Sequence, residues 1–226
     1  MTVGVVILCR YSSKRLPGKI LLPIAGKPIL THIVERVRRS GLPVMVATSD
    51  QASDDAIEQH CRLIDVACFR GSLDNVAERF LRAAETQGCQ YATRINGDNL
   101  FVDPDLLREM AQIAASGDYE FVTNVPGRSY PPGSSIEIVD VKAYSALAVC
   151  FSEPRHREHV TLFLYDHPES CKYYIHVNPQ REEMAGLNLA IDTVEDYLRA
   201  QRIVADLPEP LLERSLMEII NTEKRL

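Results

Sequence analysis

Apolar runs alternate with stretches of helical periodicity along the first half of the chain. The run Val3–Cys9 is apolar throughout and rich in β-branched residues, which is typical of a strand buried on both faces. From Pro28 apolar residues recur at helical spacing until Gly41, where we expect a helix to end. The same patterns predict strands at 44–48, 66–69, 91–95 and 120–123, and helices ending near 60 and spanning about 73–86 and 104–115. This alternation predicts β-α-β units and a mainly parallel sheet.

The alternation breaks at about residue 125, where a loop rich in proline and glycine begins. Beyond it we expect a strand at 136–141, helices ending near 150 and spanning about 158–165, and a strand at 172–177. The run at 187–191 predicts a strand that returns to the central sheet, followed by helices at 193–205 and 210–221. We therefore expect a single α/β domain over 1–226, with a core of 1–124 and 186–226 and an inserted α+β lobe at about 125–185.

Neither a membrane span nor an export signal is evident in the sequence. The longest near-continuous apolar stretch, Val3–Cys9, is far shorter than the roughly 20 residues that a span requires. It lacks the basic start and the cleavage site of a signal peptide. The six cysteines form no C-x-x-C pair and no cluster with zinc spacing, so we interpret them as reduced thiols. We expect a cytoplasmic protein without membrane contact.

The net charge of −6 conceals a strong asymmetry. Residues 10–39 carry eight cations and one acid, a net charge of +7, which leaves −13 for the rest of the chain. A basic block in an acidic chain favours one anionic ligand over a nucleic acid. Arg36, Arg38 and Arg39 lie in the predicted helix, and we interpret them as a solvated helix face. The cations of 10–19 follow no helical period.

The loop Arg10–Lys19 directly follows the first predicted strand. It holds four cations and two serine hydroxyls within ten residues, and Gly18 allows the backbone to approach a ligand closely. In parallel sheets, ligands bind beyond the carboxyl ends of the strands. The composition suits a triphosphate, because arginine forms paired hydrogen bonds to phosphate and lysine supplies a point charge. The loop matches neither the dinucleotide-binding glycine pattern nor the P-loop, which disfavours a dehydrogenase and a P-loop kinase.

At these residues the sequence resembles a known family, the sugar-acid cytidylyltransferases. They include the CMP-KDO synthetases, the acylneuraminate cytidylyltransferases and the branch of the spore coat polysaccharide biosynthesis protein F. The resemblance rests on motifs in the family's order: R-x-x-S-x-R-L-P-G-K at 10–19, V-A-T-S-D at 46–50, F-R-G-S at 69–72, E-R-F at 78–80, R-I-N-G-D at 94–98, G-x-x-x-E at 133–137, R-E-H-V-T at 157–161 and I-D-T-x-E-D at 191–196.

The resemblance implies a GT-A-like fold, CTP as co-substrate, Mg²⁺ as cofactor and a homodimer that pairs through the inserted lobe. It implies a set of residues that hold the triphosphate: Arg10, Ser12, Ser13, Arg15, Gly18 and Lys19. Other residues would frame the base and the ribose: Thr48, Ser49, Arg70 and Gly71. Mg²⁺ would bind to Asp98 and Asp192, and the catalytic residues would be Arg10, Lys19 and Asp98. A small anionic acceptor would contact Glu137, Arg157 and His159.

Several of these residues have an alternative structural interpretation. Asp192 precedes a predicted helix and could belong to its cap, and Glu137 could lie on the solvent face of a strand. Arg94, inside a predicted strand, suits an ion pair as well as a ligand contact. His159 could be a packed histidine, and a role as general base is the less favoured interpretation.

The acceptor half of the motifs departs from the family pattern. Pro132 and Ser135 stand where the family has acids, which predicts an unusual acceptor. Three alternative functions stay open: a nucleotidyltransferase that uses UTP or GTP, a glycosyltransferase, and a non-catalytic nucleotide-binding module. A glycosyltransferase usually carries a D-x-D metal motif, and here Asp103-Pro-Asp105 opens a predicted helix, where capping is the favoured interpretation.

Overall fold

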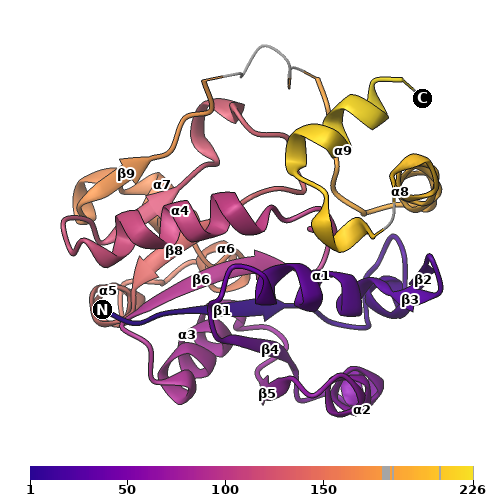
Figure 1. The fold of residues 1–226 in the computed structure, drawn as a ribbon. Helices are drawn as coiled ribbons and strands as arrows, with labels where there is room; N and C mark the ends of the chain where they lie inside the picture. Colours follow the sequence, from indigo (N-terminus) through magenta and orange to yellow (C-terminus); the bar gives the residue numbers. More distant parts are fainter. Residues whose placement is uncertain (180–183, 185, 209, 226) are drawn as a thin grey trace.

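A mainly parallel sheet of seven strands forms the centre of the computed structural model, which describes residues 1–179, 184, 186–208 and 210–225 (Figure 1). In sheet order the strands are β5 (Ala67–Gly71), β4 (Val44–Ser49), β1 (Val3–Leu8), β6 (Tyr91–Asn96), β8 (Glu137–Asp140), β7 (Phe121–Thr123) and β9 (Tyr173–Ile175). Only β8 runs antiparallel to its neighbours. A short hairpin of β2 (Pro23–Ile24) and β3 (Lys27–Pro28) stands apart. The predicted fold class is confirmed.

Helices cover both faces of the sheet (Figure 1). They are α1 (Ile29–Arg38), α2 (Asp55–Leu63), α3 (Val76–Gln87), α4 (Pro104–Ala115), α5 (Val141–Ala148), α6 (Pro154–Glu158), α7 (Leu162–Asp166), α8 (Val194–Asp206) and α9 (Leu216–Glu223). Val5 and Ile7 of β1 pack in a core with α1, α4 and α9, whereas Val6 and Leu8 pack with α3 and α5. The strand is therefore buried on both faces, as its uninterrupted apolar run predicts.

Side-chain caps fix the starts of the helices next to the site. Asn75 accepts a hydrogen bond from the N–H of Glu78, so α3 begins at Val76, three residues later than the apolar pattern predicts. Asp103 accepts from the N–H groups of Asp105 and Leu106 at the start of α4. The D-x-D sequence is thus a helix cap, which leaves the glycosyltransferase alternative without its metal motif.

Three predicted elements differ in the structure. The expected helix at 210–221 is a 3-10 turn at Leu211–Glu213 followed by α9, which begins after its cap, Ser215. The expected strand at 187–191 is an extended segment outside the sheet, because its backbone bonds to loops instead of a strand ladder: Leu189 donates to Pro132 O (2.8 Å) and Ile191 to Asp98 O (3.2 Å). The expected helix at 158–165 is two short helices, α6 and α7, because His159 adopts an extended conformation between them.

The strands expected in an inserted lobe take part in the main sheet. β8 pairs with β6 and β7, and β9 pairs with β7. The region 125–185 is thereby tied to the core by backbone hydrogen bonds. Its proposed end near residue 185 lies outside the described residues.

Arg36 contradicts the expectation of a solvated helix face. It is fully buried, and its guanidinium donates to three carbonyl oxygens, of Val102 (2.8 Å), Leu211 (2.6 Å) and Arg214 (2.9 Å). Burial is the main reason that the pKa of Arg36 is lowered to about 10. This arginine ties α1 to the loop before α4 and to the segment before α9, so part of the basic block has a structural role.

None of the helices that the structure describes combines the length and the apolar character needed to cross a bilayer.

Candidate active site

A cavity of about 350 Å³ opens beyond the carboxyl ends of β1 and β6. Its charged lining, drawn from both ends of the sequence, is Arg10, Lys14, Arg15, Lys19, Arg79, Arg94, Asp98, Glu158 and Asp192. Six cations thus face three carboxylates. The excess of positive charge favours an anionic ligand with more than one charge, and the carboxylates offer oxygen ligands for a cation.

The loop after β1 folds back on its own Tyr11. The carbonyl oxygen of Tyr11 accepts hydrogen bonds from the N–H groups of Ser13 and Gly18, both at 2.8 Å. Gly18 has a φ of +69°, and a Cβ there would lie 3.0 Å from the Tyr11 ring. The sequence therefore requires glycine at this position to close the loop. Ser13 lines the cavity, whereas Ser12 does not.

Lys19 joins the loop to the distant Asp192. Its ammonium donates to the carbonyl oxygen of Ile191 (2.7 Å) and to Asp192 Oδ1 (3.0 Å). Arg15 contacts the other carboxylate oxygen, Oδ2, at 2.9 Å. Because the Ile191 N–H also donates to Asp98 O, the segment is fixed against the end of β6. The cap of α8 is supplied by Thr193, so the side chain of Asp192 is not its cap.

The carboxylate of Asp98 is the second acidic group of the cavity. Its Oδ1 is buried and has no hydrogen-bond partner among the residues that the structure describes. Burial is the main reason that the pKa of Asp98 is raised; the Lys19 ammonium opposes the shift, and the negative charge of Asp192 adds to it. Two neighbouring carboxylates, one with an unused oxygen, fit a divalent cation that takes its remaining ligands from phosphate and water.

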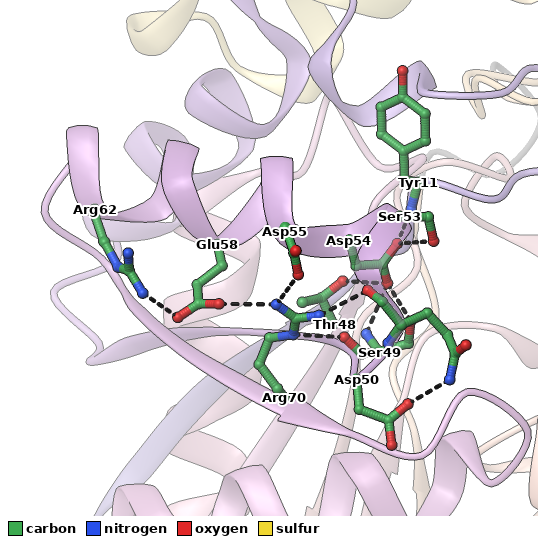
Figure 2. Close-up of polar contacts among 11 residues, drawn as sticks. Tyr11, Thr48, Ser49, Asp50, Ser53, Asp54, Asp55, Glu58, Arg62 and Arg70 are labelled. Carbon is green, nitrogen blue, oxygen red and sulfur yellow. Dashed lines mark hydrogen bonds and ion pairs between the residues drawn. The ribbon is translucent and has the colours of Figure 1, made fainter.

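Thr48 and Ser49 do not line the cavity; both are fully buried around Asp54 (Figure 2). Asp54 Oδ2 accepts from the Thr48 hydroxyl (2.8 Å), the Ser49 N–H (2.9 Å) and the Ser49 hydroxyl (2.5 Å). Its other oxygen, Oδ1, accepts from the N–H of Tyr11 at 2.8 Å. The buried carboxylate therefore holds the residue on which the basic loop folds back, and the T-S pair supports the loop from behind.

Arg70 also lies outside the cavity, and Gly71 follows it at the end of β5. The guanidinium of Arg70 contacts Asp55 (2.6 Å) and Glu58 (2.9 Å) of α2 (Figure 2). It also donates to the carbonyl oxygens of Ser49 and Gln51. Through these contacts, Arg70 of β5 connects the end of β4 to α2. The structure brings neither Arg70 nor Gly71 to the cavity wall, so the predicted role in framing the base has no support from their position.

We predict that Asp54→Asn lowers kcat/KM for CTP, the co-substrate that the family resemblance implies, by about 10- to 100-fold, because the loop is no longer held at Tyr11. An amide has one acceptor oxygen in place of two, so buried donors lose partners and unfolding becomes easier by about 1–3 kcal/mol. Steady-state kinetics and denaturant unfolding check both effects. Asp50→Asn is the matched control, since Asp50 is exposed and its carboxylate accepts, within the described part of the chain, from the neighbouring Gln51 alone. Equal kinetics of the two variants would contradict the prediction.

The hydrogen bonds to Asp54 make the stability of the fold depend on pH. Although burial raises the pKa of Asp54, hydrogen bonds from Ser49, Tyr11 and Thr48 lower it overall. The carboxylate therefore contributes stability that is complete above its ordinary pKa of about 3.9 and is lost as the pH falls through the lower pKa of the folded state. In acid unfolding, the advantage of the wild type over Asp54→Asn should be complete at pH 5–7 and should shrink as the pH falls below the ordinary pKa of an aspartate, about 3.9.

The three predicted acceptor contacts take different positions. His159 is exposed and lines the cavity beside Glu158, whose carboxylate lies 3.9 Å from Arg10. Arg157 points elsewhere and donates to the carbonyl oxygen of Phe151. Glu137 is buried and bonded to Arg94, so it is neither a solvent-facing residue nor part of the cavity wall.

Three cations of the cavity wall, Lys14, Arg79 and Arg94, are not among the predicted site residues. Arg79 of α3 is almost fully buried; it donates to the carbonyl oxygen of Ser72, and its Nε has no partner among the described residues. The sequence allows an ion pair or a ligand contact for Arg94. In the structure Arg94 forms an ion pair with Glu137 and also lines the cavity. The signal for Arg79 was available in the E-R-F motif, since a charged residue amid apolar neighbours needs a buried partner or a ligand.

Comparison with known proteins agrees with the family resemblance seen in the sequence motifs. The model of the cytidylyltransferase family matches residues 4–223. The spore coat polysaccharide biosynthesis protein SpsF of Bacillus subtilis is 35% identical over 201 residues, 85% of this chain and 82% of that protein. The 3-deoxy-manno-octulosonate cytidylyltransferase of Idiomarina loihiensis is 34% identical over 119 residues, 51% of this chain and 47% of that protein.

Solved structures share the fold. A cytidylyltransferase from Leptospira borgpetersenii serovar Hardjo-bovis superposes with a TM-score of 0.93 at 30% identity, over 100% of this chain and 94% of that one. The CMP:2-keto-3-deoxy-manno-octonic acid synthetase complexed with CTP gives a TM-score of 0.64 at 17% identity, over 91% and 99% of the two chains.

Proposed function

The chain belongs to the cytidylyltransferase family, which makes it a CTP-dependent nucleotidyltransferase, and we propose that it transfers CMP from CTP to an acidic sugar. The names of its relatives support a place in the biosynthesis of a surface glycan, because one acts in spore coat polysaccharide biosynthesis and another on 3-deoxy-manno-octulosonate. The products would be a CMP-sugar and pyrophosphate.

The observation that carries this proposal is the meeting of the basic loop with two carboxylates in one cavity. Lys19 contacts Asp192 directly, and Asp98 lies close enough for the charges of both to affect its pKa. In-line attack on the α-phosphate expels pyrophosphate and needs charge neutralisation and positioning more than covalent chemistry. A site with cations for the phosphates and carboxylates for a metal suits that reaction.

Each part of the loop has a task in this reaction. Arg10, Arg15 and Lys19 bind the triphosphate, and Ser13 and the backbone at Gly18 add hydrogen bonds. The cations hold the β- and γ-phosphates and stabilise the charge that develops on the leaving pyrophosphate. Closure of the loop on Tyr11 fixes these donors before the nucleotide binds, so little orientation is lost during the reaction.

We assign the metal site to Asp98 and Asp192. The unpartnered Oδ1 of Asp98 and the neighbouring carboxylate of Asp192 fit Mg²⁺, which takes one or two protein carboxylates together with phosphate oxygens and water. When bound, the ion would neutralise phosphate charge. Asp192 is then shared with Lys19 and Arg15, which places the metal beside the triphosphate cations.

The nucleotide preference is tested by thermal unfolding with Mg²⁺ and each of CTP, UTP, GTP and ATP. At about 100 times its dissociation constant, a ligand stabilises the fold by about 2.7 kcal/mol. In a chain of this size, that free energy corresponds to a rise in Tm of about 5–10 °C. We expect this rise with CTP and a much smaller one with the other three. A larger rise with UTP or GTP would contradict the proposal and favour the alternative nucleotidyltransferase.

We also propose a cytoplasmic homodimer. All six cysteines are free thiols, which suits a reducing compartment. Strand β9 forms one edge of the sheet, and Ile175 and Val177 expose 40% and 53% of their surfaces beside it. This edge lies in the region 125–185, where the family resemblance places the contact between subunits. Light scattering measures the mass directly, and a monomer at micromolar concentration would contradict the proposal.

A further inference from the structure

Arg94 stands on β6, the strand that leads to Asp98, and β8 is the neighbouring strand in the sheet. It is in register with Glu137 of β8, and its Nη1 donates to the Glu137 carboxylate and to the Thr161 hydroxyl (3.3 Å). The triphosphate cations Lys19 and Arg15 are instead bonded to Asp192. The cavity therefore has two cationic positions held by different elements.

Both carboxylate oxygens of Glu137 already accept hydrogen bonds from protein groups. Its Oε1 accepts from the hydroxyls of Thr161 and Tyr165, both at 2.6 Å, and its Oε2 accepts from Arg94. The Tyr165 hydroxyl is itself 2.8 Å from the hydroxyl of Thr123. With 4% of its side chain exposed, Glu137 cannot reach the acceptor and acts instead to fix the guanidinium.

The fixed guanidinium is only half satisfied. Its Nε is buried without a partner, and its Nη2 makes no hydrogen bond to any residue that the structure describes. Arg94 lines the cavity with 18% of its side chain exposed. Nε and Nη2 form the edge of an arginine that pairs with both oxygens of a carboxylate. A guanidinium on a cavity wall that has unused donors beside its ion pair with Glu137 can take a second anionic partner.

We propose that Arg94 binds the carboxylate of the acceptor and that Glu137 is its positioning residue. The inference rests on the proposed cytidylyl transfer and names the group that selects the acceptor. Pairing Nη1 with Glu137 orients the guanidinium plane, so that the edge left free can recognise a planar anion. Glu137 also neutralises Arg94 when no acceptor is present, which removes the cost of an unpaired buried charge.

The test uses Arg94→Lys, which keeps the charge next to Glu137 but loses the paired donors. Pyrophosphate release is measured with CTP and three kinds of acceptor: 3-deoxy-manno-octulosonate and N-acetylneuraminate as acids, glucose 1-phosphate, and glucose. We expect the wild type to use an acid, and Arg94→Lys to raise the KM of that acid by about tenfold or more. The KM for CTP and the Tm shift with CTP should stay within about twofold and a few degrees of the wild type. Arg82→Lys, on the exposed surface of α3, is the control.

Glu137→Gln tests the positioning role separately, because it keeps the size of the side chain but has no charge and only one acceptor oxygen to share between Arg94 and the hydroxyls of Thr161 and Tyr165. It should raise the KM of the same acid with little change in kcat. A rise in the KM of CTP in Arg94→Lys would overturn the inference and assign Arg94 to the nucleotide. The inference would also be overturned if the wild type binds CTP but uses glucose 1-phosphate or glucose, or if it uses neither of the two acids. Failure to bind CTP would instead contradict the proposed function.

Discussion

Asp98→Asn should lower the rate of pyrophosphate release by about 10²–10³-fold at saturating CTP and acceptor. The amide has nearly the shape of the carboxylate but lacks the negative charge that the metal site requires. The fold should persist, since Asp98 Oδ1 makes no hydrogen bond to the described residues that the amide would break. The backbone contact from Ile191 to Asp98 O is unaffected by the substitution.

Measurement of kcat across a range of Mg²⁺ concentrations checks this prediction. We expect the variant to need more Mg²⁺ for its residual activity, which a merely structural role would not cause. Asp118→Asn is the control, because Asp118 is exposed and its carboxylate makes no hydrogen bond or ion pair within the described ranges. A turnover close to that of the wild type, in a correctly folded variant, would rule out Asp98 as the metal ligand.

The succession of strands and helices along the chain could be predicted, because each element is specified by a local sequence pattern. The apolar run of β1 specifies a strand with two buried faces, and Asp103 marks the start of α4 by its own hydrogen bonds. The segment 187–191 has the same apolar signature, with Leu189 and Ile191 each 1% exposed. It forms no strand because its partners are loop residues 132 and 98, which no local pattern identifies.

The residues of the candidate site also fall into two groups, those that a local sequence pattern identifies and those whose role depends on distant contacts. The Arg10–Lys19 loop was identifiable because its charges are concentrated within one loop and break the helical period. The roles of Thr48 and Ser49 were not, since they depend on Asp54, whose link to Tyr11 joins residues 43 positions apart. The pairing of Arg94 with Glu137 likewise joins residues 43 positions apart and becomes visible only when β8 inserts beside β6. Contacts set by strand order require the folded chain.

Lys19→Ala should cost at least about 10²-fold in kcat/KM for CTP, because two tasks of the ammonium are lost together. In the proposed site Lys19 supplies charge to the triphosphate, and its bonds to Ile191 O and Asp192 hold one proposed metal ligand against the loop. With Lys19 removed, the Asp192 carboxylate keeps, among the described residues, the ion pair with Arg15, whose exposed side chain constrains it weakly. The variant should therefore lose affinity for the nucleotide and also need more Mg²⁺.

Titration of CTP at low and high Mg²⁺ separates the two tasks. If Lys19 only contacted phosphate, the loss would be the same at both concentrations, whereas a role in placing Asp192 makes the loss larger at low Mg²⁺. Lys27→Ala is the matched control, since Lys27 belongs to the same basic block but pairs with Glu35 outside the cavity. Lys19→Arg should recover part of the affinity, because it retains the charge without the compact ammonium that fits between Ile191 and Asp192. Nearly unchanged kinetics in Lys19→Ala would show that the triphosphate lies elsewhere.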